Sequence, residues 1–301
     1  MPELLTQFAP LNAVLSVVER IALSESPVLI TGERGTGKTL LARAIHAASR
    51  RAGPMVEVDA SALPAELLDI ELFGLEEEGA GRRPGALEHA ASGTVLIDEV
   101  AAMGHTSQTK LLHAMTRAHL PTVDGLGRIA ISARIVATTA HPLLAFTRDG
   151  RFSEPLHERL RNAHIELPPL RERRTDIPLL AQQFNGQFGG LRAPRLTPDV
   201  MAVLEEYPWP GNVRELRTVI ERAVTEANGG EVLPRQVGAL LSASDASAPM
   251  KLADLERRHI EAVLRQTNWH RGRAAALLGI SNKTLYRKIR EYGFTPPAAS
   301  D

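Results

Sequence analysis

Short apolar runs alternate with helical patterns along the first part of the chain. The runs that read as strands are Val28–Thr31, Met55–Asp59, Thr94–Asp98, Arg134–Thr139 and Ala163–Leu167. Strands that alternate with helices are typical of a parallel sheet with helices on both faces. The pattern therefore predicts an α/β fold of this kind over residues 1–169.

The rest of the chain reads as helical. Prolines and the Pro208–Gly211 turn interrupt the helical pattern over residues 170–241. Residues 242–250 are small, polar and unpatterned, so they predict a flexible linker. Residues 251–301 then form a last helical unit. We therefore expect an α/β domain, a helical domain, a linker and a second, all-α domain, in that order.

Composition excludes several classes of protein. The 301 residues are 44% apolar, as in soluble globular proteins, and include no cysteine, so disulfides and Cys-ligated zinc are excluded. The ten histidines form no HExxH motif, and no uncharged apolar run could span a bilayer. The N-terminus carries Glu3 and Glu19 and does not read as a signal peptide. We expect a cytoplasmic protein with no membrane partner.

A glycine-rich loop follows the first predicted strand. The run GERGTGKT lies between the apolar run Val28–Ile30 and the helical run Leu40–Ile45, which is the context that a phosphate-binding loop requires. The alternative, a glycine-rich loop without a ligand, does not explain this context. Lys38 would reach the β- and γ-phosphates and the Thr39 hydroxyl would ligate Mg²⁺. The predicted cofactor-binding residues of the loop are Gly32, Glu33, Arg34, Gly35, Thr36, Gly37, Lys38 and Thr39.

Two carboxylates end the third predicted strand. Asp98 and Glu99 follow the apolar run Thr94–Ile97, and the carboxyl ends of strands are where open α/β sheets place their ligands. Asp98 would hold Mg²⁺ through water, and Glu99 would orient and polarise the attacking water as the candidate catalytic residue. Together with the phosphate-binding loop, this pair indicates hydrolysis of a nucleoside triphosphate rather than binding alone.

The last unit has the pattern of a helix-turn-helix. We expect helices over Leu252–Gln266, Gly272–Leu278 and Asn282–Glu291, with Gly279 breaking the second and Ser281 capping the third. Residues 251–301 hold ten lysines or arginines against five aspartates or glutamates, a local net charge of +5. A basic helix after such a turn favours DNA binding, while an ordinary helical hairpin with a solvated charged face is the alternative.

With these residues in place, the chain resembles the sigma-54-dependent enhancer-binding proteins, a branch of the AAA+ ATPases. The strings that carry the resemblance are Glu71–Gly74 (ELFG), Gly85–Gly93, Leu167–Pro178 (beginning LPPLRERR) and Trp209–Leu216 (WPGNVREL). The resemblance implies an AAA+ fold, an α-helical lid, ATP and Mg²⁺ as cofactors, RNA polymerase holoenzyme as partner, and assembly into a ring. It also implies that Arg214 senses the γ-phosphate, that Thr139 is the polar sensor of the fourth strand, and that Arg159 acts in trans.

The C-terminal unit resembles the Fis-type helix-turn-helix that closes most of these proteins. The resemblance implies binding to double-stranded DNA at an enhancer or operator. The residues assigned to DNA binding are Ser281, Asn282, Lys283, Thr284, Tyr286, Arg287, Lys288 and Arg290.

The chain departs from the family at three places. The family carries GAFTGA, the loop that touches the sigma factor, where this chain has the shorter, charged stretch Leu75–Pro84. Ser153 replaces the first of two trans-acting arginines. Asp59 replaces the asparagine that holds the catalytic glutamate, and an aspartate beside Glu99 would repel it or share a proton with it.

Two functions remain open at this point. One is an active ATPase that opens sigma-54 promoters. The other is a regulator that uses ATP as an assembly ligand: a repressor, an activator of the housekeeping polymerase, or a partner subunit in a mixed ring with a complete homologue. The Leu75–Pro84 stretch favours the second. A P-loop kinase would leave the lid and the helix-turn-helix unexplained. No receiver or sensing domain precedes the ATPase, so either the protein lacks one or the chain is a fragment.

Overall fold

The computed structural model describes residues 6–77, 81–121, 128–247 and 269–292, together with 256, 259–261, 263, 264, 266, 267 and 294. The chain divides into two compact units, Met1–Leu241 and Ser242–Asp301. Among the described residues, no helix combines the length and the apolar character needed to cross a membrane.

A five-stranded parallel sheet lies at the centre of the first unit. Its order is β2-β5-β8-β1-β9, and all four pairings are parallel. The strands are β1 (Val28–Thr31), β2 (Met55–Asp59), β5 (Thr94–Asp98), β8 (Arg134–Thr139) and β9 (Ala163–Glu166). The α/β fold expected from the sequence is confirmed, and β9 ends one residue earlier than its apolar pattern suggested.

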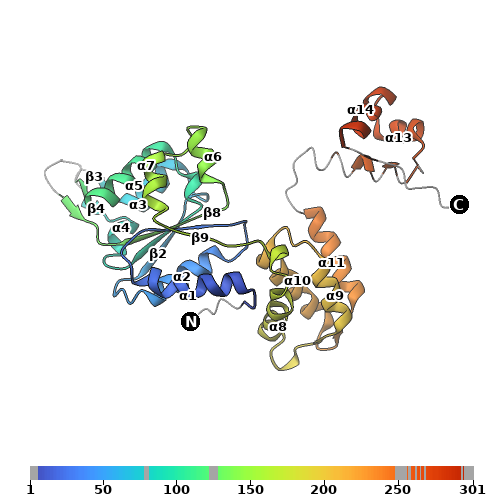
Figure 1. Cartoon of the computed structure of the whole chain (residues 1–301), viewed down its shortest axis with the longest axis horizontal. Helices are drawn as coiled ribbons and strands as arrows, with labels where there is room; N and C mark the ends of the chain where they lie inside the picture. The colour runs from blue at the N-terminus through green and yellow to red at the C-terminus, as the bar shows by residue number, and fades with distance from the viewer. Residues whose placement is uncertain are drawn as a thin grey trace. The chain divides into compact units, whose positions relative to one another are not determined.

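Helices cover both faces of this sheet (Figure 1). One face packs on α1 (Ala9–Leu23) and α2 (Lys38–Ala48), with a core that includes Ile30, Leu96 and Val136. The other face packs Leu29, Val95 and Ile97 with five helices. Residues alternate between the two cores because successive side chains of a strand point to opposite faces. The five helices are α3 (Ala65–Phe73), α4 (Ala86–His89), α5 (His105–Arg117), α6 (Leu143–Arg148) and α7 (Glu154–Leu160).

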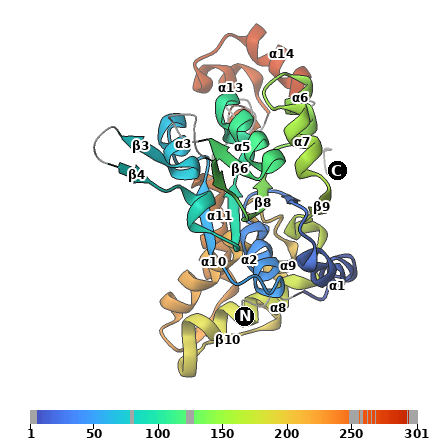
Figure 2. The same ribbon diagram turned by 90° about the vertical axis from the view of Figure 1, so that its left-hand side faces the viewer.

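Two small antiparallel hairpins extend this unit. The first joins β3 (Leu75–Glu77) to β4 (Gly81–Arg83) and extends away from the sheet (Figure 2). The second joins β6 (His119–Pro121) to β7 (Arg128–Ala130). The first hairpin occupies the position at which the resemblance expects GAFTGA.

A helical lid follows the sheet. It contains the 3₁₀ turns η2 (Leu170–Glu172) and η3 (Gly190–Arg192), the helices α8 (Asp176–Gly189), α9 (Pro198–Glu206), α10 (Asn212–Ala227) and α11 (Pro234–Ser247), and the short strands β10 (Arg195–Leu196) and β11 (Glu231–Val232). Its core is a separate apolar cluster around the fully buried Trp209, whose indole N–H donates to the Leu204 carbonyl at 2.8 Å. A core of its own makes the lid a packed subdomain.

The end of α11 corrects one expectation. The sequence predicted a flexible linker over residues 242–250, but α11 continues to Ser247. Alanine is the strongest helix former and serine is tolerated, so the stretch Ser242–Ser247 contains nothing that ends a helix. Residues 248–250, which include Pro249, lie outside the described residues.

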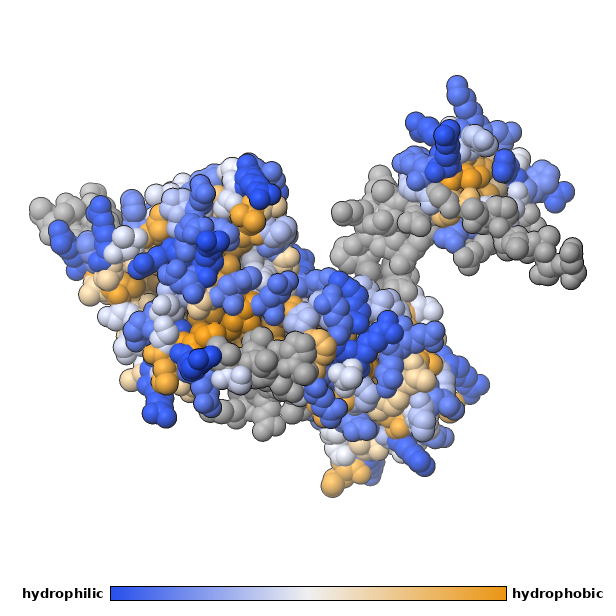
Figure 3. Space-filling model, viewed as in Figure 1, coloured by the Kyte–Doolittle hydropathy of each residue, from blue (hydrophilic) through white to orange (hydrophobic). Residues whose placement is uncertain are grey.

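The second unit contains a helix-turn-helix. Helix α13 (Arg271–Leu278) ends at Gly279, which has φ +65°, and α14 (Asn282–Tyr292) follows. Ile260, Leu264, Ala274 and Leu285 belong to its core, and Figure 3 shows hydrophilic side chains around a hydrophobic centre. Part of the helix expected over Leu252–Gln266 lies outside the described residues, while those described in that range are helical.

Candidate functional site

The loop Gly32–Thr39 joins β1 to α2 in a conformation that requires glycine. Gly32 has φ +148°, and a Cβ placed there would lie 2.6 Å from the Leu167 carbonyl oxygen. Gly35 has φ +80°, and a Cβ there would lie 2.3 Å from the Gly211 carbonyl oxygen. Both glycines therefore permit a backbone path that L-side chains would block. The loop ends at the N-terminus of α2, where free N–H groups and the helix dipole favour an anion.

Lys38 lies almost buried within this loop. Its Nζ donates to the carbonyls of Gly32 (2.9 Å) and Glu33 (3.2 Å) and lies 3.6 Å from Glu99 Oε1, with 6% of the side chain exposed. Burial lowers the pKa of Lys38, and the charges of Glu99 and Asp98 oppose that shift. The ammonium is thus fixed beside the loop where phosphate oxygens would bind.

Asp98 has two hydroxyl neighbours. The Thr39 hydroxyl donates to its Oδ2 at 3.5 Å, and the Thr138 hydroxyl donates to its Oδ1. A carboxylate and a threonine hydroxyl are the hard oxygen ligands that Mg²⁺ prefers. The donor set therefore suits the metal that the sequence predicted at Thr39 and Asp98.

Two neighbouring threonines at the end of β8 have different partners. Thr139 was the predicted sensor, but its hydroxyl accepts the backbone N–H of His141 at 3.0 Å, and Thr138 contacts Asp98. Adjacent residues of a strand point to opposite faces, so a shift by one residue changes the partner. Sequence reasoning missed Thr138 because two threonines stand together at this strand end.

Glu99 contacts groups other than the one expected. It has φ +53°, and its Oε2 accepts the Ala140 N–H at 3.0 Å and lies 3.4 Å from His141 Nδ1. Asp59 was expected to act on Glu99. Its Oδ1 instead accepts the N–H and hydroxyl of Ser61, at 2.8 and 2.7 Å. The neighbour that fixes Glu99 is therefore the segment after β8.

A cleft of about 670 Å³ unites these groups with the lid. Arg214 of α10 lines it, and the neighbouring Val213 N–H donates to the Gly35 carbonyl at 3.0 Å. The predicted arginine therefore faces the phosphate-binding loop. Among the residues that line the cleft are Arg34, Gly35, Gly37, Lys38, Thr39, Asp59, Asp98, Glu99 and Arg214.

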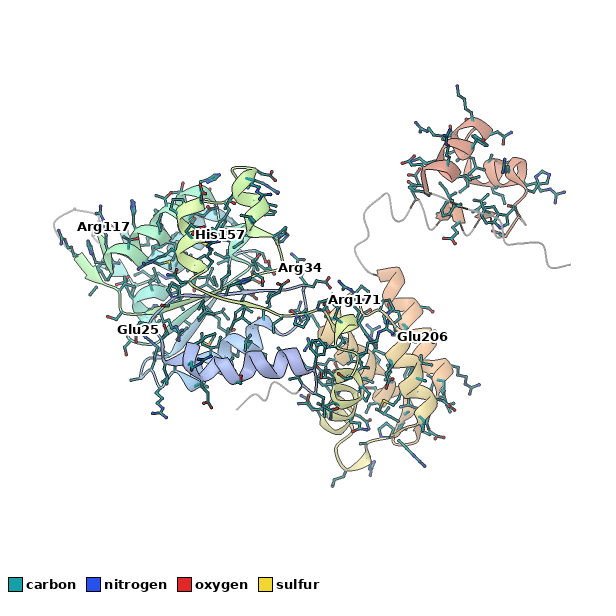
Figure 4. The ribbon with its side chains drawn as sticks, viewed as in Figure 1. Glu25, Arg34, Arg117, His157, Arg171 and Glu206 are labelled. Carbon is teal, nitrogen blue, oxygen red and sulfur yellow. The ribbon has the colours of Figure 1, made fainter. Side chains whose placement is uncertain are left out.

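Glu33 belongs to the loop but faces the lid. Its carboxylate receives two hydrogen bonds from the Arg171 guanidinium, at 2.8 and 2.7 Å, and one from Asn212 Nδ2 at 3.1 Å. The hydrogen bonds from Arg171 lower the pKa of Glu33. Figure 4 shows Arg34 and Arg171 close to this junction. Glu33 therefore fixes the lid to the loop and is a poor candidate for nucleotide contact.

A second arginine of the lid reaches the same loop from inside the protein. Arg173 is 2% exposed and donates to the Thr36 carbonyl at 2.7 Å, and its guanidinium lies 3.7 Å from Asp176. Sequence reasoning identified the string around Arg173 without giving this residue a role. The sequence signal for Arg173 was the run of arginines directly after the last strand of the sheet. One of them is buried and donates to a carbonyl of the loop.

The two trans-acting positions lie on or beside α7. Arg159 is exposed, and its Nη2 donates to the Met115 carbonyl at 3.3 Å. The backbone N–H of Ser153 donates to Gln108 Oε1 at 2.7 Å, just before the helix begins. Neither residue lines the cleft. Within one chain, the structure does not bring Arg159 to the nucleotide site.

The predicted DNA-binding residues lie on and just before α14. Ser281 caps this helix by accepting the Thr284 N–H at 3.1 Å. Asn282, Lys283, Tyr286, Arg287 and Arg290 are exposed, and a surface groove runs along Lys283, Thr284, Arg287 and Arg290. Residues at this spacing share one face of a helix. Exposed Arg271 and Arg273 on α13 add positive charge that the sequence assignment omitted.

Lys288 corrects the assignment on this helix. Its side chain is 16% exposed and donates to Glu256 Oε2 at 2.9 Å and to the Tyr292 hydroxyl at 3.3 Å. The hydrogen bond from Lys288 to Glu256 raises the pKa of Lys288. Lys288 therefore stabilises the packing of α14 within its own unit. It lies away from the exposed basic face because it is one position beyond Arg287 on the helix.

Three family models match the chain in sequence order. They are the Sigma-54 interaction domain over residues 4–166, the AAA+ ATPase lid domain over 171–253 and the Fis family of bacterial regulatory proteins over 251–292. The regulatory protein AtoC of Escherichia coli (strain K12) is 40% identical over 315 residues, covering 97% of this chain and 68% of AtoC. The regulatory protein NtrX of Azorhizobium caulinodans is 36% identical, with coverages of 92% and 66%.

Solved structures agree with the sequence matches. The crystal structure of NtrX from Brucella abortus in complex with ATP has a TM-score of 0.73 and 34% identity, covering 97% of this chain and 69% of that one. The chain thus spans about two thirds of the length of these relatives. The three family models cover the nucleotide-binding loop, the lid and the helix-turn-helix. The chain belongs to the sigma-54-dependent enhancer-binding proteins and is an AAA+ ATPase with a Fis-type helix-turn-helix domain.

Proposed function

We propose that this protein is a transcriptional regulator that binds ATP and Mg²⁺, binds double-stranded DNA at an enhancer or operator, and cannot remodel sigma-54 polymerase alone. It assembles into a ring of its own copies or into a mixed ring with a complete homologue. The proposal rests on the family membership of the chain and on two departures from the family pattern.

The nucleotide site supports the first part. Lys38 would neutralise charge on the β- and γ-phosphates, and Thr39 and Asp98 would hold Mg²⁺. Arg214 would reach the phosphates from the lid, because Val213 is hydrogen-bonded to the loop itself. Bound Mg²⁺ would neutralise the charge that develops on the transferred phosphoryl group.

The β3–β4 hairpin is the observation that carries the rest of the proposal. Its sequence, Leu75–Pro84, contains three glutamates and two arginines and lacks the Phe-Thr tip of GAFTGA. Arg82 is bound within the protein, since its guanidinium donates to Glu88 at 2.6 and 3.3 Å. A charged, hydrated hairpin suits solvent better than an apolar contact with a sigma factor.

The second departure concerns hydrolysis. In a ring, Arg159 would face a neighbouring subunit, but Ser153 offers no positive charge at the position of the first trans-acting arginine. A missing arginine finger costs about 10³-fold or more in rate. We therefore expect slow ATP turnover by this protein alone.

Ser153→Arg tests this explanation. If the subunits assemble into a ring, steady-state ATP turnover should rise by about tenfold or more, a fraction of the full effect of an arginine finger. Ser92→Arg, at an exposed turn, is the matched control for the added charge. Fast turnover by the wild-type protein, or an equal rise in the control, would contradict the role given to Ser153.

A fully active sigma-54 activator is the second candidate. The match to the Sigma-54 interaction domain over residues 4–166 and the geometry of Lys38, Asp98 and Glu99 favour it. It differs from the first proposal only in the effector step, which the hairpin would then have to perform with a different sequence.

A further inference from the structure

Each carboxylate oxygen of Glu99 has its own partners. Glu99 directly follows β5 in a left-handed conformation, φ +53° and ψ +51°, and its side chain is 12% exposed. Its Oε2 accepts the Ala140 N–H at 3.0 Å and lies 3.4 Å from His141 Nδ1, while its Oε1 lies 3.6 Å from Lys38 Nζ. The two oxygens of one carboxylate therefore have different partners.

A bound nucleotide would affect the contacts of Oε1 and Oε2 differently. Lys38 is the cation that phosphates attract, so its contact with Oε1 would be given up when the cleft is occupied. Ala140 and His141 lie beyond β8, and neither lines the cleft. Their contacts with Oε2 would persist, leaving Oε1 to accept a hydrogen bond from the attacking water.

His141 is well placed to make such a contact. Its backbone N–H donates to the Thr139 hydroxyl at 3.0 Å, and its ring lies against the Phe146 ring, with centroids 5.4 Å apart. An imidazole can donate from Nδ1 in its neutral form, whereas the carboxylate of Asp59 can only accept. Asp59 is in any case bound to Ser61.

We propose that His141 is a positioning residue that holds Glu99 Oε2 by donating its Nδ1 proton, so that Oε1 is directed at the water that attacks ATP. This role rests on the proposed function, with hydrolysis at Glu99. His141 acts through Glu99 and touches no phosphate itself.

Kinetics of the 301-residue chain test the proposal. His141→Ala should lower kcat for ATP hydrolysis about tenfold and leave KM within about twofold, because a lost positioning bond acts in the transition state. His141→Asn should recover most of the rate, because the asparagine amide places a donor near the position of Nδ1. His164→Ala is the matched control, because His164 binds the Thr31 hydroxyl at 2.8 Å and does not touch Glu99. Single-turnover measurements with labelled ATP would follow even slow hydrolysis.

A measurement without turnover separates this proposal from the proposed function. In ¹⁵N-histidine NMR spectra, His141 should be the Nδ1–H tautomer in the wild-type protein and should return to the Nε2–H form in Glu99→Ala. An unchanged tautomer would overturn the proposal even if the protein hydrolyses ATP. So would a rise in kcat for His141→Ala, or a failure of His141→Asn to rescue. The tautomer change without measurable hydrolysis would uphold the contact and count against hydrolysis at Glu99 instead.

Discussion

Lys38 is a buried cation with oxygen partners on several sides. Two backbone carbonyls and one oxygen of Glu99 surround its ammonium, and 6% of the side chain is exposed. A buried charge is tolerated only when it is paired and hydrogen-bonded. These partners hold the ammonium at the mouth of the loop, so that it is in place before phosphates arrive.

Lys38→Ala should abolish most ATP affinity, by about 100-fold or more, because Lys38 is the lysine that the loop offers to the phosphates. The fold should persist, since Glu99 keeps its bond from Ala140. Isothermal titration calorimetry with ATP measures the change. Lys110→Ala, which removes an ion pair with Asp69 elsewhere on the unit, is the control and should bind ATP normally. Unchanged affinity in Lys38→Ala would end the phosphate-loop interpretation.

At the residue scale, the sequence identifies the chemistry but not every partner. Lys38, Asp98 and Glu99 were predicted because their residue types and spacing are specific to a site that binds nucleoside triphosphates. Thr138 was missed and Lys288 was misassigned because residue type alone does not distinguish each from its neighbour. Thr139 stands next to Thr138, and Arg287 stands next to Lys288. Which of two neighbours faces a site depends on the register of the strand or the rotation of the helix, and packing of the whole unit decides both.

At the element scale, two arginines join the lid to the phosphate-binding loop, and their burial differs. Arg171 and Glu33 are each 43% exposed, whereas Arg173 is 2% exposed beside the fully buried Asp176. Desolvation lowers the pKa of Arg173, and the charge of Asp176 opposes that shift. Removing one partner from a buried charge pair costs far more than removing one from a solvated pair.

Arg173→Ala should therefore lower the free energy of unfolding by about 3 kcal/mol. Arg171→Ala should lower it by about 1 kcal/mol or less, because solvent screens that pair. Urea unfolding followed by Trp209 fluorescence measures both, in a Trp269→Phe background that leaves one tryptophan, in the lid. Equal losses in the two variants would contradict this arrangement of the lid.

Helix α14 offers a matched pair of cations for DNA binding. Arg287 is exposed on the basic face, while Lys288 is bound to Glu256 and Tyr292. Each phosphate contact contributes about −0.9 to the slope of log K against log salt. Arg287→Ala should reduce that slope by about one contact, and Lys288→Ala should leave it unchanged. Fluorescence anisotropy with operator DNA at several salt concentrations measures both slopes. A smaller slope for Lys288→Ala would show that Lys288 contacts the DNA.

Element boundaries were predicted where the sequence changes character abruptly. The strands are short apolar runs between polar turns, and four of the five have the predicted bounds. The end of α11 was not predicted, because a serine and alanine stretch suits a helix as well as a linker, and the preceding helix decides between them. The hairpins β3–β4 and β6–β7 were not predicted either, since their short polar strands carry no alternating apolar pattern.

At the scale of the whole molecule, the two activities reside in separate units. The nucleotide cleft belongs to residues 1–241 and the basic helix face to residues 242–301. In the proposed function, a ring would couple these two parts to RNA polymerase. Whether this chain can do so alone depends on the hairpin Leu75–Pro84 and on Ser153, which together determine the proposed function.

Open-complex formation at a sigma-54 promoter is the measurement on which the proposed function depends. Sigma-54 RNA polymerase, promoter DNA with its enhancer, and ATP would be mixed with the wild-type protein, and melted promoter DNA would be detected by permanganate footprinting. A complete enhancer-binding protein with GAFTGA serves as the positive control. We expect no melting with this protein alone, and none with Ser153→Arg, because the hairpin is a separate defect. ATP-dependent melting by the wild-type protein alone would contradict the proposed function and would show that Leu75–Pro84 replaces GAFTGA.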